Sequence, residues 1–292
     1  MDKMILRTFV RGAYDVQKLR IQTGNRIVAN FKTQLGQAPG TKEDELSDEA
    51  KSILDNFRAE YDLIADAIIS DGVKRITDKV FVGRKLISNS SVYTLVRSYV
   101  HLSDDEDDQF KEISKIVKKE PIWVNFLEGV RGCGPTMAAV LLSEIDISIA
   151  TYPSSLWMLS GLDVAPDGRG RSMRAEHLID RTYIDKKGEE QTKKSITFNP
   201  FLKTKMMGVL ASSFIKAGGH YSEVYYNYKN RLVNRPDLSE ESKGHIHNMA
   251  LRYMVKIFYI DLYNAWRPLE GLPVAPPYHV AKLGMRDHSV QA

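Results

Sequence analysis

Apolar residues recur at helical spacing along most of this chain, and this periodicity limits the folds open to it. Ile5, Phe9, Ala13 and Val16 begin the first such series, which is interleaved with basic residues. Positions three and four apart lie on one face of an α-helix, so the series predicts a long amphipathic helix over residues 4–35. We therefore expect a mostly α-helical protein.

Residues 1–119 continue this pattern. Apolar spacing predicts two further helices, over about 47–68 and 90–101. Ser103 followed by Glu106 forms a capping box, which predicts that a separate helix starts there. We expect a helical arm or bundle whose long helices pair within one chain or dimerise between two copies.

Residues 120–268 are expected to form a second helical domain. Two β-prone pieces, Arg181–Ile184 and Ser195–Phe198, predict a small β insertion in it. Residues 269–292 are rich in proline and predict an extended C-terminal tail. The helices predicted in the second domain cover residues 121–130, 135–145, 153–160, 199–217, 220–232 and 239–265.

Charge and cysteine content narrow the class of protein. The net charge is only +4, but basic residues concentrate before residue 33 and between Arg169 and Arg235, which suggests faces that meet polyanions. The single cysteine excludes an intramolecular disulfide and a cysteine zinc cluster, in keeping with a reducing compartment.

The sequence has neither a signal-peptide pattern nor an apolar run near the roughly 18 residues of a membrane span. We expect a cytoplasmic protein without a membrane partner.

A short turn between two predicted helices carries the clearest functional motif, a helix-hairpin-helix turn. Gly132 and Gly134 flank Cys133, and Pro135 follows at the start of the next helix. Glycines permit unusual backbone conformations and leave N–H groups uncovered at a helix N-terminus, where a phosphate is favoured. Cys133 should point inward as a small apolar plug. The alternative is a helical corner without a ligand. The turn residues expected to contact DNA are Arg131, Gly132, Gly134 and Thr136.

A Gly- and Arg-rich loop over residues 163–174 is the second candidate for phosphate contact. Arginines on such a loop can approach a phosphate closely and donate two hydrogen bonds to it. A solvated surface loop is the alternative, but the neighbouring hairpin favours phosphate binding. The expected contacts are Arg169, Arg171 and Arg174, with Lys203 and Lys205 farther along the chain.

Three other groups are interpreted as structural. His245 and His247 splay apart on a helix, and the acidic run 104–108 is typical of a solvated helix start, so we expect no metal site. Tyrosines at helical spacing are more typical of a core or a subunit interface than of base stacking. They are Tyr221, Tyr225, Tyr226 and Tyr228.

The order of these pieces resembles the C-terminal portion of bridge-RNA-guided insertion-sequence transposases, which combine a RuvC-like DEDD domain with a catalytic-serine domain. The similar stretches are Leu6 to Leu35, Leu127 to Ile145, Leu156 to Pro166 and Asn199 to Ser213. We do not expect residues 1–292 to form the strands of a RuvC-like domain, nor the acidic run 104–108 to replace its carboxylate tetrad. The resemblance implies a DNA partner and a role in recombination, and it leaves RNA open as a second partner.

The resemblance also implies a catalytic serine in the loop after Pro166. Ser172 lies slightly late for that position, among arginines that would stabilise an attacked phosphate. A serine nucleophile needs a base, and His177 serves only if the loop folds back toward it. We therefore expect Ser172→Ala to leave any activity on DNA intact.

Three functions follow. The first is a DNA-binding protein of a mobile-element or recombination system that grips the phosphate backbone, as a homodimer. The second is a serine-type transposase or recombinase that acts through Ser172. The third is a structural assembly protein without nucleic-acid activity. No cofactor is expected, and Mg²⁺ is expected only if the chain is catalytic.

Overall fold

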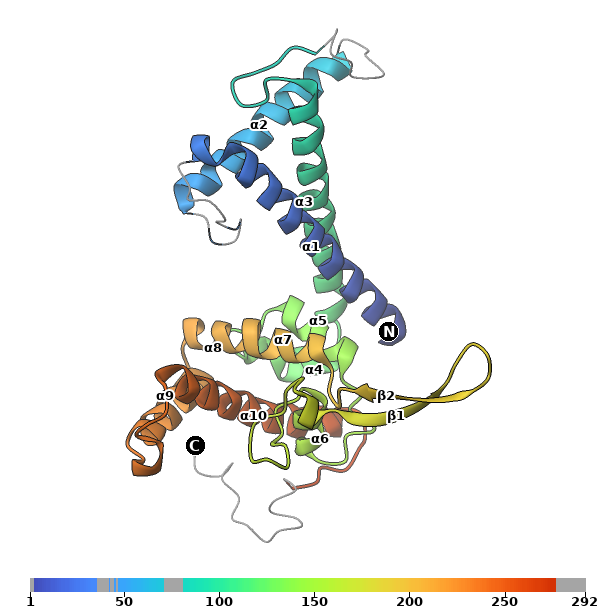
Figure 1. The fold of residues 1–292 in the computed structure, drawn as a ribbon, viewed down its shortest axis with the longest axis vertical. Coiled ribbons are helices and arrows are strands. Elements are labelled where there is room, and N and C mark those ends of the chain that lie inside the picture. Colours follow the sequence, from blue (N-terminus) through green and yellow to red (C-terminus); the bar gives the residue numbers. More distant parts are fainter. Residues whose placement is uncertain (1–2, 36–41, 43–44, 46, 71–80, 277–292) are drawn as a thin grey trace. The chain divides into compact units, whose positions relative to one another are not determined.

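The computed structural model describes residues 3–35, 42, 45, 47–70 and 81–276, with the backbone alone at 28–35, 50 and 68–70. Over these residues the fold is mostly helical, as the periodicity predicts, and contains one small two-stranded sheet (Figure 1). Within the described ranges, no helix combines the length and the apolar character needed to cross a membrane.

The chain divides into two compact units. One covers Thr8–Glu112, and the other combines Met1–Arg7 with Ile113–Ala292. We refer to them as the arm unit and the main unit.

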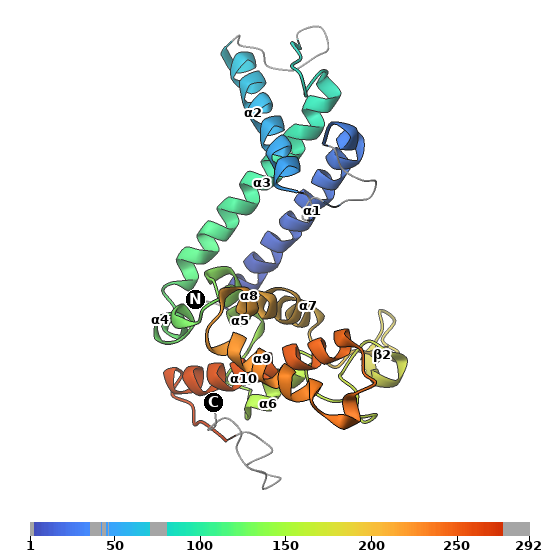
Figure 2. The same cartoon turned by 90° about the vertical axis from the view of Figure 1, so that its left-hand side faces the viewer.

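Three long helices form the arm unit and pack on one another (Figure 2). They are α1 (Lys3–Leu35), α2 (Asp48–Ser70) and α3 (Ser90–Val117). Their shared core includes Phe57 and Val96, which are almost completely buried. The apolar faces identified in the sequence therefore pack on each other.

The expectation of a separate helix start at Ser103 is wrong, because α3 continues through it. A capping box requires the Glu106 side chain to reach back to the serine backbone. Instead, the Glu106 carboxylate accepts hydrogen bonds from α1, from Gln17 Nε2 at 2.9 Å and from Arg20 Nε at 2.5 Å. The partly buried ion pair occupies this glutamate, and the helix runs on.

The main unit is built around α10 (Lys243–Leu269), which packs against α9 (His220–Val233) and α6 (Pro153–Leu159) (Figure 1). Tyr259 and Tyr263 of α10 are completely buried. On α9, Tyr221 and Tyr225 are buried, as expected of a core stripe. The other two tyrosines differ, since Tyr226 is exposed and Tyr228 stacks on Tyr253.

One continuous helical run crosses the main unit. It begins as α7 (Pro200–Thr204), passes through the π-helical segment η4 (Lys205–Leu210) and ends as α8 (Ala211–Ala217). The side chain of Asn199 caps it, accepting a hydrogen bond from the Leu202 N–H at 3.1 Å.

The sheet is the antiparallel pair β1 (Ile179–Ile184) and β2 (Glu190–Ser195), which projects from the helices as a ribbon (Figure 1). The prediction of a strand over Ser195–Phe198 is wrong, because β2 ends at Ser195. Phe198 is buried, and its ring lies so close to Gly161 that a Cβ there would come within 2.7 Å of it. This core contact takes the segment out of the ribbon.

Helix α10 extends past its predicted end at residue 265 and includes Pro268. The buried Arg267 guanidinium donates to the carbonyls of Ile147 and Ala150, and to that of Pro273 at 2.7 Å. These bonds tie the helix end to two neighbouring segments. The part of the predicted tail from residue 277 onward lies outside the described residues.

Candidate nucleic-acid interface

The predicted hairpin lies between α4 (Pro121–Asn125) and α5 (Pro135–Glu144), with a 3-10 turn at Leu127–Gly129. Gly132 has a φ of +89°, which side-chain-bearing residues resist. A Cβ at Gly132 would also lie 2.9 Å from the backbone of Ser213 in α8. The turn is therefore seated directly on α8, and only glycine fits there.

Gly134 does not need the unusual backbone angles that the sequence suggested for both glycines. Its φ of −75° and ψ of 170° are ordinary extended values, and a Cβ there would meet nothing within 4 Å. It is the N-cap residue of α5 but has no side chain with which to cap the helix. The first-turn N–H groups of Thr136 and Met137 consequently have no side-chain cap. An anion is favoured at such an end.

Cys133 is buried between the two glycines, with 5% of its surface exposed. Burial raises the pKa of its thiol to about 12, so it is an inert apolar plug, as predicted. Arg131 on the other side of Gly132 is exposed, and its side chain lies against Gly219. The four turn residues expected to contact DNA thus lie within one short segment.

The loop over residues 163–174 folds back on itself. The Arg171 N–H donates to the carbonyl of Asp163, and the Arg171 guanidinium also binds the Asp163 carboxylate, with Nη2 at 2.8 Å from Oδ2. Arg169 and Arg174 are exposed. The three predicted arginines therefore differ, because one of them is already held by a carboxylate of the same loop.

Three more cations lie near this loop. Lys203 Nζ of α7 donates to the Arg171 carbonyl at 2.5 Å. From α10, the Arg252 guanidinium donates to the Gly161 carbonyl at 3.3 Å. Lys256, one turn farther along α10, lies over the ring of Trp157 at 5.2 Å. We call Arg171, Lys203, Arg252 and Lys256 the cation cluster.

The cation cluster and the carboxylate beside it together carry a net positive charge. Burial lowers the pKa of Lys203 to about 8, and the charge of Arg252 lowers it further. Burial also lowers the pKa of Lys256 and of Arg252. For all three, Asp163 is the carboxylate whose charge opposes this shift. One carboxylate therefore faces four cations that are partly removed from water.

Sequence reasoning found Arg171 and Lys203 but missed Arg252 and Lys256. The two missed residues lie about eighty positions after the loop, on a helix that the sequence gives no reason to place under it. Their spacing of four along α10 was the available signal, because it puts both on one face. Lys205 lies over the Phe201 ring at 5.6 Å, and burial lowers its pKa to about 8.

The loop also brings Ser172, His177 and Asp167 together. The Ser172 hydroxyl lies 2.9 Å from His177 Nδ1, and the Ser172 N–H donates to the same nitrogen. Because Nδ1 accepts, Nε2 carries the proton and donates to Asp167 Oδ2 at 3.0 Å. That hydrogen bond is the main cause of the lowered pKa of Asp167.

This arrangement satisfies the condition set for His177, since the loop does fold back toward it. The imidazole is buried, with 2% of its surface exposed, whereas Ser172 remains partly accessible. The Ser172 N–H and hydroxyl compete for one nitrogen lone pair. The chain of bonds suits either a lock that orders the loop or a base for the serine.

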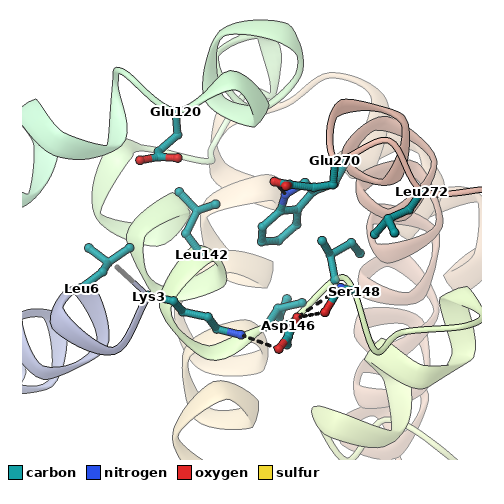
Figure 3. Close-up of a pocket in the computed structure, with 11 residues that line it drawn as sticks. Lys3, Leu6, Glu120, Leu142, Asp146, Ser148, Glu270 and Leu272 are labelled. Carbon is teal, nitrogen blue, oxygen red and sulfur yellow. Dashed lines mark hydrogen bonds and ion pairs between the residues drawn. The ribbon is translucent and has the colours of Figure 1, made fainter. Parts of the chain in front are cut away.

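A separate cavity of about 280 Å³ lies where the N-terminal turn of α1 meets the ends of α5 and α10 (Figure 3). Lys3 and Asp146 point toward each other there, 3.9 Å apart. Glu120 and Glu270 also line it. Three carboxylates and one ammonium give this cavity a charge that repels phosphate.

Among the residues that the structure describes, no group of three or more His, Cys, Asp or Glu side chains is placed to hold a metal ion. His247 Nδ1 lies 2.6 Å from the Tyr225 hydroxyl. In the acidic run, Asp104 pairs with Arg58, and Asp108 pairs with Lys111. These side chains are engaged in ordinary structural contacts.

Comparison with protein-family models, with curated proteins and with solved structures gives no match. Function is therefore inferred from the sequence and the geometry. The turn and the loop meet the same helical run at opposite ends, at Ser213 and at Lys203. Ten residues at no more than 1.5 Å each separate those ends by at most roughly 15 Å.

Proposed function

We propose that this protein binds duplex DNA through the sugar-phosphate backbone, as part of a recombination or mobile-element system. The cation cluster is the observation that carries the proposal. Partly buried cations that outnumber their carboxylates are costly unless an anion joins them. A backbone phosphate next to Arg171 and Lys203 would supply that anion.

The hairpin turn supports the same partner. Its uncapped α5 N-terminus offers N–H groups to a second phosphate, and the accessible Gly134 leaves room for close approach. A separation of at most roughly 15 Å corresponds to no more than about four base-pair steps at 3.4 Å each. A single duplex is long enough to contact both sites. Such contacts hold DNA without reading its sequence.

The test is duplex binding as a function of salt. Each neutralised phosphate adds roughly −0.9 to the slope of log affinity against log salt, so affinity should fall steeply. The double variant Lys203→Met/Lys256→Met should bind more weakly, with a slope shallower by about one to two. Lys111→Met removes an exposed ammonium elsewhere and should leave the slope unchanged. Affinity that stays level between low and moderate salt would contradict the proposal.

A second function, phosphoryl transfer through Ser172, is favoured by the bond chain from Ser172 through His177 to Asp167. In this reaction the Ser172 oxygen forms a bond to phosphorus, and the bond from phosphorus to one DNA oxygen breaks. The hydroxyl proton passes to His177 Nδ1, and Asp167 stabilises the resulting imidazolium. The imidazolium then gives the proton to the departing DNA oxygen, which leaves as a free hydroxyl end. The cation cluster would stabilise charge on the non-bridging oxygens.

A covalent adduct decides between the two functions. Wild type, Ser172→Ala and His177→Gln are incubated with a nicked suicide duplex and analysed on denaturing gels. An adduct that is lost in Ser172→Ala supports phosphoryl transfer. Binding without an adduct leaves the protein as a DNA binder. Absence of both would favour the structural assembly protein.

RNA as a second partner and pairing of two copies are further proposals from the sequence. Mobility shifts with duplex and single-stranded RNA test the first. Sedimentation of the full chain over a range of concentrations tests the second, and a single species at the monomer mass would contradict it.

A further inference from the structure

The two faces of the β1–β2 ribbon differ in charge. Directly opposite residues of an antiparallel pair share a face, so the register of the two strands assigns each side chain to one face of the ribbon. One face, which we call the basic face, has no acidic residue. Its members are Ile179, Arg181, Tyr183, Gln191, Lys193 and Ser195.

Arg181 and Lys193 lie directly opposite each other on the basic face. Like charges in this position destabilise a ribbon. Lys193 Nζ lies 4.8 Å from the centre of the Tyr183 ring, and 43% of that tyrosine is exposed. The basic face thus combines two uncompensated cations with an accessible aromatic ring.

The opposite face carries charges of both signs. Asp180 pairs with Lys194 at 2.9 Å, and Glu190 lies opposite Ile184. Both acidic residues of the two strands therefore lie on this face. Such segregation is not needed for the stability of the ribbon, because mixing the charges would serve that better.

The ribbon makes little contribution to the core of the main unit. All its strand residues are exposed except Ser195, which is half-buried. Its tip is nevertheless ordered: the Asp185 carboxylate accepts the N–H groups of Lys187 and Glu189, and Gly188 adopts a φ of +83°. The ribbon is therefore exposed on both faces, and its conformation is stabilised by its own turn.

We propose that this ribbon enters the major groove of duplex DNA with its basic face toward the base edges. A two-stranded ribbon fits the width of that groove, and an arginine can donate two hydrogen bonds to guanine O6 and N7. Six residues per strand span about 20 Å, or roughly six base-pair steps. The major groove of A-form RNA is too narrow, so the partner is DNA. This inference rests on the proposed DNA binding and adds base readout to it.

The experiment removes a base-edge acceptor without altering the backbone. The full chain is titrated with a guanine-rich duplex and with the same duplex carrying 7-deazaguanine, which lacks N7. Wild type should bind the modified duplex roughly tenfold more weakly. Arg181→Gln/Lys193→Gln should bind both duplexes equally. Lys194→Gln, which loses a cation from the opposite face, should discriminate as wild type does.

Each outcome bears on one claim. Wild type that binds both duplexes equally tightly would overturn the ribbon proposal and leave backbone binding intact. Wild type that binds neither would overturn both proposals. Equal discrimination by the double variant would also refute the ribbon. Both variants change exposed side chains, and circular dichroism tests whether they remain folded.

Discussion

The hairpin turn and the loop over residues 163–174 are both candidates for phosphate contact, but they are built differently. The turn is made of backbone, with Gly132 pressed against α8 and N–H groups as its donors. The loop is made of side chains, with Arg171 and Lys203 supplied by separate elements. A backbone site should depend on single positions for its existence, whereas a side-chain site should weaken gradually as charges are removed.

The largest effect is expected from Gly132→Ala. A φ of +89° and a Cβ 2.9 Å from the Ser213 backbone should cost roughly 1–3 kcal/mol in the free energy of unfolding. Urea denaturation measures this cost. Gly134→Ala, two positions away in open space, should cost about 1 kcal/mol or less, as a weaker N-cap. Equal stability of the two variants would refute the seating of the turn on α8.

A second large effect should appear with pH. The pKa of Lys203 is lowered to about 8 in the free protein, and a bound phosphate favours the protonated amine. Duplex affinity should therefore be full below pH 8 and fall as the pH rises through 8. The stability of the DNA-free protein should show the opposite trend. Lys203 loses its proton near pH 8 in the folded state but only near 10.5 in the unfolded state. The unfolded state therefore binds more protons between these values, so the free energy of unfolding rises from pH 8 to 10.5.

Calorimetry in buffers of different ionisation enthalpy measures the proton taken up on binding. Lys203→Arg stays charged throughout this range and should reduce the uptake. Equal proton uptake by wild type and Lys203→Arg near pH 8 would contradict a phosphate at Lys203.

Gly134→Val should act on binding more than on folding. Its backbone angles are ordinary, so the added side chain covers the first-turn N–H groups of α5 without strain. We expect a roughly three- to tenfold loss of duplex affinity, which is the value of about one hydrogen bond. Anisotropy titration measures it, with urea denaturation as the control for folding. Unchanged affinity would make the turn purely structural.

The smallest effect is expected from Ser172→Ala. Although the hydroxyl contact with His177 is lost, the Ser172 N–H still donates to Nδ1, so the loop should keep its shape. Duplex affinity should change by less than about twofold, since no charge is removed. A large loss would mean that the hydroxyl itself orders the loop or binds the phosphate.

Local patterns predicted most of the fold. Helical periodicity located α1, and the paired glycines located the hairpin. Each of these signals is made by residues that are close to one another in sequence. The break of α3 at Ser103 was predicted wrongly, since the partner that engages Glu106 is Arg20, far away in sequence. A capping pattern says nothing about such a competing ion pair.

The candidate site was predicted only in part for the same reason. Arg171 stands in a recognisable loop, but Arg252 and Lys256 reach it from a distant helix. The return of His177 to Ser172 depends on how a loop closes, which composition does not determine. For the turn, the sequence identified both glycines but not which of them needs its unusual backbone angle.

The π-helical segment Lys205–Leu210 sets the rotational phase between the two ends of its helix. A π turn holds an extra residue, and one residue turns an α-helix by about 100°. The same ten residues wound as an ordinary α-helix would rotate Ser213 by nearly that angle relative to Lys203. The face that packs against Gly132 would then point elsewhere, with every side chain of both sites still present. A substitution that converts this segment to ordinary winding should therefore displace the turn, whereas deleting one residue, such as Gly208, should keep the two ends in phase.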